Sequence, residues 1–94
     1  MNNQHKKPIK KAAAIKYDVT DSAPQVIAKG KGIVAQNILD KADESTIPIY
    51  KDEELADTLT KLDIGEYIPP ELYKIVAEIM IFVSDLDEMR DKLI

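Results

Sequence analysis

Few side chains in this sequence could act as nucleophiles or general bases. There is no cysteine, and the one histidine, His5, lies close to the amino terminus. A serine nucleophile needs a base placed beside it, but Ser22, Ser45 and Ser84 fall in turn-like or exposed contexts. We therefore expect no catalytic residues, and we do not expect the protein to be an enzyme.

Two patterns of charged residues could bind ions instead. The turn Lys29-Gly30-Lys31-Gly32 precedes a predicted helix, whose first backbone N–H groups could hold an anion. It contains neither the P-loop pattern nor the dinucleotide-binding glycine pattern, so we interpret its glycines as permitting the change from strand to helix. A run of carboxylates near the C-terminus could attract a divalent cation, but such a run is usually a solvated helix face, and we expect neither a metal site nor a cofactor. These carboxylates are Asp85, Asp87, Glu88 and Asp91.

Charge separates the chain into a basic tail and an acidic body. Residues 1–17 carry five lysines and no acid, whereas residues 18–94 carry eight bases and 17 acids, a net charge of −9. The tail, residues 1–10, is either a flexible, solvated terminus or a contact to nucleic acid, acidic lipid headgroups or an acidic protein. We favour the solvated terminus and do not expect nucleic acid as a partner, because a nucleic-acid-binding domain would also carry bases on its folded surface.

The length and hydropathy of the chain fit one small domain. A chain of 94 residues has room for one modest core, which we assign to residues 11–94. The longest apolar run, Ile79–Val83, is far shorter than the roughly 18 residues of a membrane-spanning helix, and residues 1–11 lack the apolar core of a signal peptide. The absence of cysteine suits a reducing compartment. We expect a cytoplasmic protein without membrane insertion.

The residue pattern predicts an α+β fold, with a small mixed sheet of about three strands flanked by three helices. The first two strands are predicted at Lys11–Tyr17 and Gln25–Ala28, with turn-forming residues between them. From Gly32 to about Ser45, apolar residues recur every three or four positions, which predicts a helix. Ile47–Tyr50 is predicted as the third strand, and its connection to the second strand through a helix favours parallel pairing in a βαβ unit.

Two further helices complete this prediction. Asp52 is a suitable N-cap for a short helix that ends near Leu62, and Pro70 suits the first turn of a long final helix. Apolar residues of the final helix form one broad stripe, which we interpret as core. These residues are Leu72, Ile75, Val76, Ile79, Phe82, Val83, Leu86 and Leu93. Ile81 lies on the opposite side and should be exposed, either as an ordinary surface residue or as a contact to a partner.

Several short motifs follow one another in a defined order. They are AAAIKYD at residues 12–18, SAPQVIAKGK at 22–31, IPIY at 47–50 and LDIGEYIPPELYKIVAE at 62–78. Each motif alone is weak, but their joint order is specific. Over residues 7 to about 86 the pattern resembles the cytoplasmic C-terminal domain of the FlhB/YscU export-switch proteins of the bacterial flagellum and type III secretion system. The resemblance implies the fold of that domain.

The sequence departs from this family at the self-cleavage site. Family members carry Asn-Pro-Thr-His just before the first motif and cut themselves between Asn and Pro. Here the four positions hold Lys7, Pro8, Ile9 and Lys10. Cleavage requires the Asn carboxamide, whose nitrogen attacks its own backbone carbonyl to form a succinimide, and a lysine cannot form that ring. We therefore expect a free-standing version of the cleaved fragment that does not cut itself.

The resemblance also implies a non-enzymatic interaction module in protein export. In the family, the cleaved fragment stays bound to the rest of the cytoplasmic domain and helps to switch substrate specificity. The expected partners are export-apparatus proteins, the remainder of a full-length FlhB-type protein, or export substrates. The first strand pairs in the family with a strand upstream of the cleavage site, so here it is expected to be an open edge. The candidate partner-binding residues are Ala12, Ala13, Ala14, Ile15, Lys16 and Ile81.

An alternative function uses charge rather than a strand edge. The basic tail and the Lys29–Lys31 turn could serve an anion-binding or nucleic-acid-binding regulator. Such binding would weaken steeply as the salt concentration rises.

Overall fold

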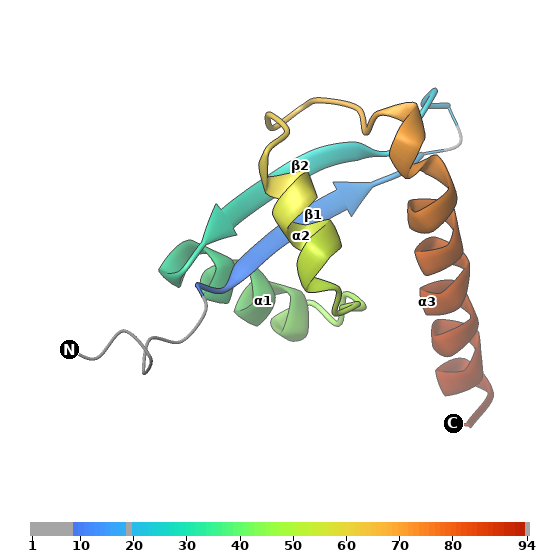
Figure 1. The fold of residues 1–94 in the computed structure, drawn as a ribbon. Helices are drawn as coiled ribbons and strands as arrows, with labels where there is room; N and C mark the ends of the chain where they lie inside the picture. Colours follow the sequence, from blue (N-terminus) through green and yellow to red (C-terminus); the bar gives the residue numbers. More distant parts are fainter. Residues whose placement is uncertain (1–8, 19, 94) are drawn as a thin grey trace.

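Two strands cross the middle of the molecule, with helices packed around them (Figure 1). The computed structural model describes residues 9–18 and 20–93, and in the last helix it describes the side chains as far as Val83. The elements in chain order are β1 (Lys11–Lys16), β2 (Gln25–Lys31), α1 (Ile33–Glu44), α2 (Glu53–Thr60), the short 3-10 helix η2 (Pro70–Leu72) and α3 (Tyr73–Leu93). The predicted α+β class with three helices is confirmed.

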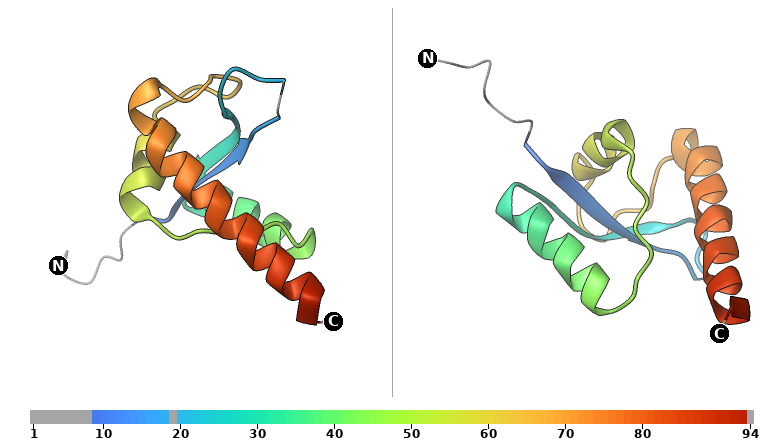
Figure 2. Two further views of the ribbon diagram at one scale, coloured as in Figure 1. Left: turned by 90° about the vertical axis from the view of Figure 1, so that its right-hand side faces the viewer. Right: turned by 90° about the horizontal axis from the view of Figure 1, so that it is seen from below.

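Helices α1 and α2 cover opposite faces of the sheet, as the view from below in Figure 2 shows. Neighbouring residues of a strand point to opposite faces, so Lys29 and Gly30 identify the two sides. The Nζ of Lys29 donates a hydrogen bond of 3.1 Å to the carbonyl oxygen of Thr60, the last residue of α2. Gly30 lies against Val34 of α1. Both faces of this small sheet are therefore covered.

The strands are antiparallel, and one β-bulge interrupts their register. Ala14 pairs with Ala28, but the next residue of β1, Ile15, pairs with Val26. Ile27 is therefore the extra residue of the bulge, and its side chain is exposed. Such a bulge increases the local twist and redirects the backbone groups beside it.

The predicted helix starts are confirmed at Asp52 and Pro70. The side chain of Asp52 accepts a hydrogen bond of 3.0 Å from the backbone N–H of Leu55, which is the expected geometry of an N-cap. Pro69 is extended, and Pro70 opens η2, which leads directly into α3. Before this junction, Gly65 has a φ of 93°, a conformation that favours glycine.

The core forms where α2, α3 and two loops meet beside the sheet. Its buried cluster consists of Ala23, Leu59, Ile68 and Val76. Ala13 and Ile15 of β1 pack against this cluster from the sheet. The core thus joins segments that are far apart in the sequence, and it fixes the first turns of α3 to the sheet.

The predicted third strand is wrong. Ile47–Tyr50 forms no strand, and the sheet of the described residues has two strands and no parallel pair. The side chains of Ile47, Ile49 and Tyr50 are all exposed. Strand propensity reflects how well a side chain packs on a half-buried pleated sheet. Residues 47–50 have no neighbouring strand among the described residues, so their propensity does not produce a strand.

The predicted core stripe of α3 is only partly correct. Val76 is buried, whereas Ile75 and Phe82 are 37% and 51% exposed. Leu72, Ile79 and Val83 are half-buried, and the side chains of Leu86 and Leu93 lie outside the described residues. Beyond its first turns α3 extends away from the sheet (Figure 2), so part of the stripe has no surface of this chain to cover it.

Within residues 9–18 and 20–93, no helix combines the length and the apolar character needed to cross a membrane.

Candidate functional site

The outer edge of β1 is the feature that the sequence predicted as a partner site. The N–H of Gly32 donates a hydrogen bond of 2.7 Å to the carbonyl oxygen of Lys10, so this pair belongs to the ladder between the strands. Hydrogen-bonded and non-bonded pairs alternate in an antiparallel ladder. Ala12 and Ala14 therefore bond to β2, whereas the N–H and C=O groups of Lys11 and Ala13 point outward.

Ile15, which follows the bulge, also directs its backbone groups to the outer edge of β1. Its partner Val26 uses both backbone groups elsewhere: its N–H donates to Glu66 over 3.0 Å, and its carbonyl accepts from Gly65 over 2.7 Å. Ile15 therefore also directs its N–H and C=O away from β2. Among the residues that the structure describes, no backbone hydrogen bond reaches the outward groups of Lys11, Ala13 or Ile15.

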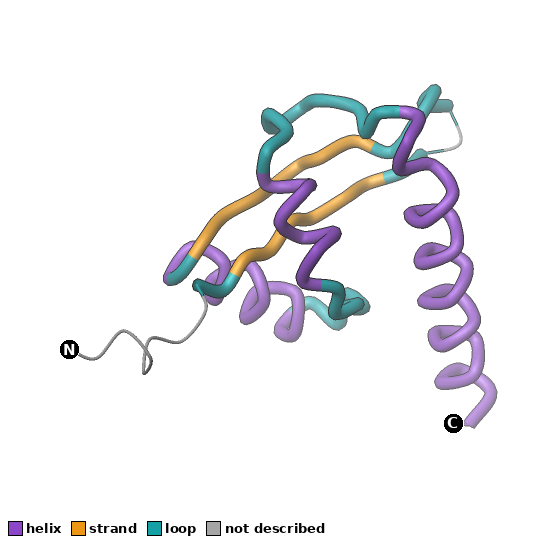
Figure 3. Tube along the Cα trace, viewed as in Figure 1, coloured by secondary structure: helices purple, strands orange, loops and turns teal. Residues whose placement is uncertain are grey.

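The opposite edge of the sheet is closed only at the start of β2, at residues 24–26. In addition to its two bonds with Val26, the loop between α2 and η2 forms a β-bridge from Tyr67 to Gln25. The N–H of Ile68 donates to the carbonyl of Pro24 over 2.9 Å. This loop runs along β2 in Figure 3. The loop therefore occupies the start of the β2 edge, whereas no backbone hydrogen bond from another described segment reaches Lys29 or Lys31.

The candidate residues of β1 would contribute backbone rather than side chains. Ala12 is buried, and Ala13, Ala14 and Ile15 are half-buried between the two helical layers. Only the side chain of Lys16 is exposed. The structure thus groups these five candidates on one strand but divides their roles, because the backbone of Ala12 and Ala14 is already used by β2.

The cleavage-motif positions and Ile81 are the remaining predicted positions. Of these, Lys7 and Pro8 lie outside the described residues. Ile9 is exposed, and the Nζ of Lys10 donates a hydrogen bond of 2.6 Å to the side chain of Gln36 in α1. Ile81 is 63% exposed, as predicted, but it belongs to α3 and not to the sheet.

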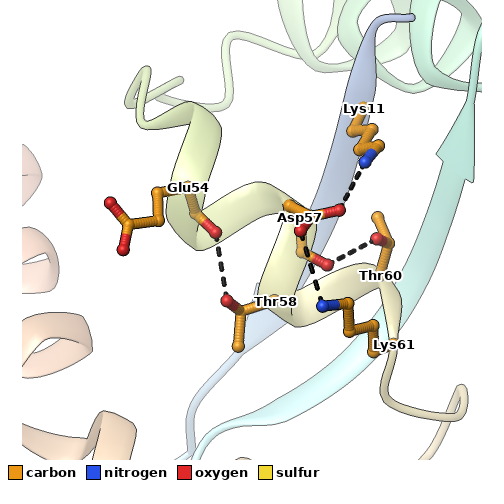
Figure 4. Close-up of polar contacts among 6 residues, drawn as sticks. All are labelled: Lys11, Glu54, Asp57, Thr58, Thr60 and Lys61. Carbon is orange, nitrogen blue, oxygen red and sulfur yellow. Dashed lines mark hydrogen bonds and ion pairs between the residues drawn. The ribbon is translucent and has the colours of Figure 1, made fainter.

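An ion pair attaches the start of β1 to α2 (Figure 4). The Nζ of Lys11 donates to one carboxylate oxygen of Asp57, and the Nζ of Lys61 lies 3.6 Å from the other. The hydrogen bond and charge of Lys11, followed by the charge of Lys61, lower the pKa of the Asp57 carboxyl below its usual value. Figure 4 also shows the hydroxyl of Thr60 donating to the carbonyl of Asp57 over 2.7 Å.

This ion pair predicts a specific loss of stability in acid. Because the pKa of Asp57 is lower in the folded state, the ionised carboxylate stabilises the fold above its unfolded pKa of about 3.9, and this contribution disappears as the pH falls through the folded value. Asp57→Asn should therefore lower the urea midpoint at pH 7, and the difference from the parent chain should shrink below about pH 3.

Asp43→Asn is the matched control, because Asp43 is exposed and its side chain forms no hydrogen bond or ion pair among the described residues. A pH-independent difference for Asp57→Asn would show that the ion pair does not provide this stability.

Sequence reasoning missed an apolar pocket between the β1–β2 connection and α3. Its volume is about 260 Å³. It is lined by Tyr17, Ser22, Ala23, Pro24, Tyr73, Ala77 and Met80. Residues 22–24 predicted only a turn, and the pocket arises because Tyr73, Ala77 and Met80 recur at helical spacing on the face of α3 that meets this turn. The one local sequence signal for this pocket is the small Ala77 between the larger Tyr73 and Met80 on this face of α3.

Lys29, Gly30 and Lys31, predicted as part of a turn, form the end of β2 and are less available than an anion site requires. The Nζ of Lys29 is directed to the carbonyl of Thr60 on the α2 face, and Lys31 is exposed. Gly32 has a φ of 58° at the start of α1, which supports the interpretation that glycine permits the turn.

Comparisons with known proteins identify the family to which this chain is related. The model of the FlhB HrpN YscU SpaS family matches residues 6–83. The protein YlqH of Bacillus subtilis (strain 168) is 46% identical over 82 residues, which cover 86% of this chain and 88% of YlqH. The flagellar biosynthetic protein FlhB of Aquifex aeolicus (strain VF5) is 45% identical over 74 residues, which cover 77% of this chain and 21% of FlhB. The chain spans about one fifth of the flagellar proteins that it matches.

Solved structures share the fold as well as the sequence pattern. A mutated C-terminal domain of EscU is similar with a TM-score of 0.76 at 30% identity, over 80% of this chain and 93% of that domain. The native SpaS C-terminal domain gives a TM-score of 0.79 over 89% of this chain and 99% of that domain, and its 15% identity supports the fold alone. The open edge of β1 therefore lies on a known scaffold, and the chain belongs to the FlhB HrpN YscU SpaS family, with the fold of that family's C-terminal domain.

Proposed function

We propose that this protein is a non-enzymatic interaction module of flagellar or type III protein export, and that it binds a partner by accepting a strand at the outer edge of β1. The observation that carries the proposal is the row of outward backbone groups on Lys11, Ala13 and Ile15, which have no backbone partner among the described residues. Exposed edges of this kind are templates for another chain.

Strand addition provides affinity through backbone hydrogen bonds and specificity through alternate side chains. Three outward residues offer six donor and acceptor groups to a partner strand. The positive side chains near this edge favour the binding of a single partner strand over aggregation, because charged residues on an edge strand oppose the pairing of one sheet edge with another. Lys16 is exposed beside the edge, whereas Lys11 is held by Asp57 on the α2 face.

The family resemblance supports one partner in particular. The matched flagellar FlhB proteins are about five times longer than the matched region, and in the family a strand upstream of the cleavage site pairs with the strand that corresponds to β1. We propose that the partner is the cytoplasmic remainder of a full-length FlhB-type protein. This chain would then replace the cleaved fragment of that protein or compete with it.

An Ala13→Pro substitution tests strand capture. Proline removes the outward N–H of Ala13 and places its ring at the edge, while edge strands tolerate proline. We expect binding to the cytoplasmic segment of an FlhB-type protein, measured by isothermal titration calorimetry, to weaken at least about tenfold, which corresponds to roughly 1.4 kcal/mol.

Ala13→Ser is the matched control, because it keeps the N–H at the same position. Ala14→Pro is a second comparison that should unfold or weaken the sheet instead, since the N–H of Ala14 points to β2. Unchanged affinity of a folded Ala13→Pro variant would contradict strand capture.

The apolar pocket beside Tyr17 favours a second function, the binding of export substrates. Its lining combines small and aromatic side chains, with Tyr17 and Tyr73 about half exposed. Such a surface suits one apolar side chain on an extended segment. Ala77→Asp should therefore reduce substrate binding without changing the binding of a strand at β1.

A further inference from the structure

A second groove lies between α2 and α3. Its volume is about 270 Å³, and it is lined by Asp52, Glu54, Leu55, Thr58, Leu72 and Ile75. The apolar part of the lining consists of the side chains of Leu55, Leu72 and Ile75. The polar part of the lining includes two carboxylates and no base.

The apolar surface continues from this groove along α3. Phe82 follows Ile75 by seven residues, so the two side chains lie on the same face of the helix, about 10 Å apart along its axis. Phe82 is 51% exposed and packs edge-to-face on Tyr50, with 5.8 Å between the ring centroids. The exposed apolar side chains of Ile75 and Phe82 thus extend the groove along α3, and we call this surface the strip.

Acidic side chains border this strip on both sides. Glu54 lies on α2, and Glu78 lies three residues after Ile75 and four before Phe82, which places it beside both on α3. Both glutamates are exposed. An occupant with lysine or arginine beside its apolar residues would therefore be electrostatically complementary.

The spacing of α3 indicates that the occupant is a helix. In the sequence, apolar residues alternate at three- and four-residue steps over seven positions: Leu72, Ile75, Ile79, Phe82, Leu86, Met89 and Leu93. Such a repeat is typical of a helix that packs along another helix. Helix α3 continues to Leu93, ten residues beyond the region that the family model matches.

We propose that the groove between α2 and α3 and the strip through Phe82 bind an amphipathic basic helix of a partner protein. This helix presents apolar side chains every three or four residues, with lysine or arginine beside them. A second copy of this chain is a poorer occupant, because residues 71–94 carry six acids and three bases, and two such helices repel each other.

Two synthetic peptides test the proposal against the full chain. The basic peptide has three heptads with leucine at the first and fourth positions and lysine at the fifth and seventh, and the acidic peptide has glutamate in place of lysine. Fluorescence anisotropy of labelled, monomeric peptides should show binding of the basic peptide only. The affinity should fall at least tenfold in Phe82→Asp and in the double variant Glu54→Lys/Glu78→Lys.

Matched controls separate the groove from general charge attraction. Ile81→Asp places the same charge one residue away on another face of α3, and Asp43→Lys/Glu44→Lys changes the net charge equally at the end of α1. Both controls should keep the affinity of the parent chain within twofold. The same should hold for Ala13→Pro, so failure of strand capture and failure of this groove give different results.

Three results would overturn the proposal. Equal binding of the two peptides would remove the role of the acidic borders, and equal losses in the control variants would show non-specific attraction. Sedimentation velocity that reveals a dimer of the chain, abolished by Phe82→Asp, would assign the strip to a second copy instead.

Discussion

A Gly30→Ala substitution is expected to destabilise the fold by about 1–3 kcal/mol, the usual cost of overpacking a close contact. A Cβ atom at Gly30 would lie 2.2 Å from Cγ1 and 2.7 Å from Cβ of Val34. Rotation about the side-chain bond of Val34 moves Cγ1 but leaves Cβ in place, so α1 itself would have to move away from the sheet. Urea denaturation measures this loss as a lower midpoint.

A double-mutant cycle with Val34→Gly separates this contact from other effects. Because Val34→Gly removes the Cβ that clashes, the two substitutions should couple, and the double variant should lose less stability than the sum of the single ones. An unchanged midpoint for Gly30→Ala, or strict additivity with Val34→Gly, would mean that α1 does not pack closely on Gly30.

The chain is also expected to remain intact under conditions in which family members cut themselves. The resemblance to the family assigns Lys7 to the position of the reactive Asn, and Asn2, Asn3 and Asn37 are not followed by proline. On this assignment, we expect the succinimide route to be closed. Intact-mass spectrometry after prolonged incubation at neutral pH should show the full chain, apart from removal of Met1, with no product that begins at Pro8.

Restoring the family tetrapeptide provides the complementary test. The triple variant Lys7→Asn, Ile9→Thr and Lys10→His introduces the carboxamide and the histidine, and the bond of the Lys10 carbonyl to Gly32 anchors the end of the motif in the ladder. A product beginning at Pro8 from the triple variant would show that the rest of the scaffold supports cleavage. The same product from the unaltered chain would contradict the account of Lys7.

Local signals in the sequence predicted the helices and their starts well. The cap at Asp52 and the double proline at residues 69–70 act through neighbouring residues, so their effects are visible in the sequence alone. The strand at Lys11–Lys16 and its partner were also predicted, although β2 continues to Lys31, three residues beyond the expected end. These elements need little information about distant parts of the chain.

The errors concern contacts between distant segments. Ile47–Tyr50 has the composition of a strand, but a strand also needs a neighbour, which composition does not reveal. The periodicity of α3 identified Val76 as core and also included Ile75 and Phe82, which are exposed. Periodicity shows that a face is apolar, but it does not show which protein covers it.

The candidate sites were also only partly predictable from the sequence. The open edge of β1 was predicted from the family resemblance, yet the particular outward residues follow from the bond between Gly32 and Lys10 and from the bulge at Ile27. Ala14 was expected to serve as well as Ala13, but its backbone faces β2. The pocket beside Tyr17 and the groove beside Ile75 each combine residues from separate elements, so no short motif identifies them.

Amide hydrogen exchange of β1, with and without the cytoplasmic segment of an FlhB-type protein, tests strand capture most directly. In the free chain, the outward amides of Lys11, Ala13 and Ile15 should exchange faster than those of Ala12 and Ala14, which bond to β2. In the complex, the three outward amides should become at least tenfold more protected, while Ala12 and Ala14 change little. A complex that forms without added protection at Lys11, Ala13 and Ile15 would contradict the proposal that β1 captures a partner strand.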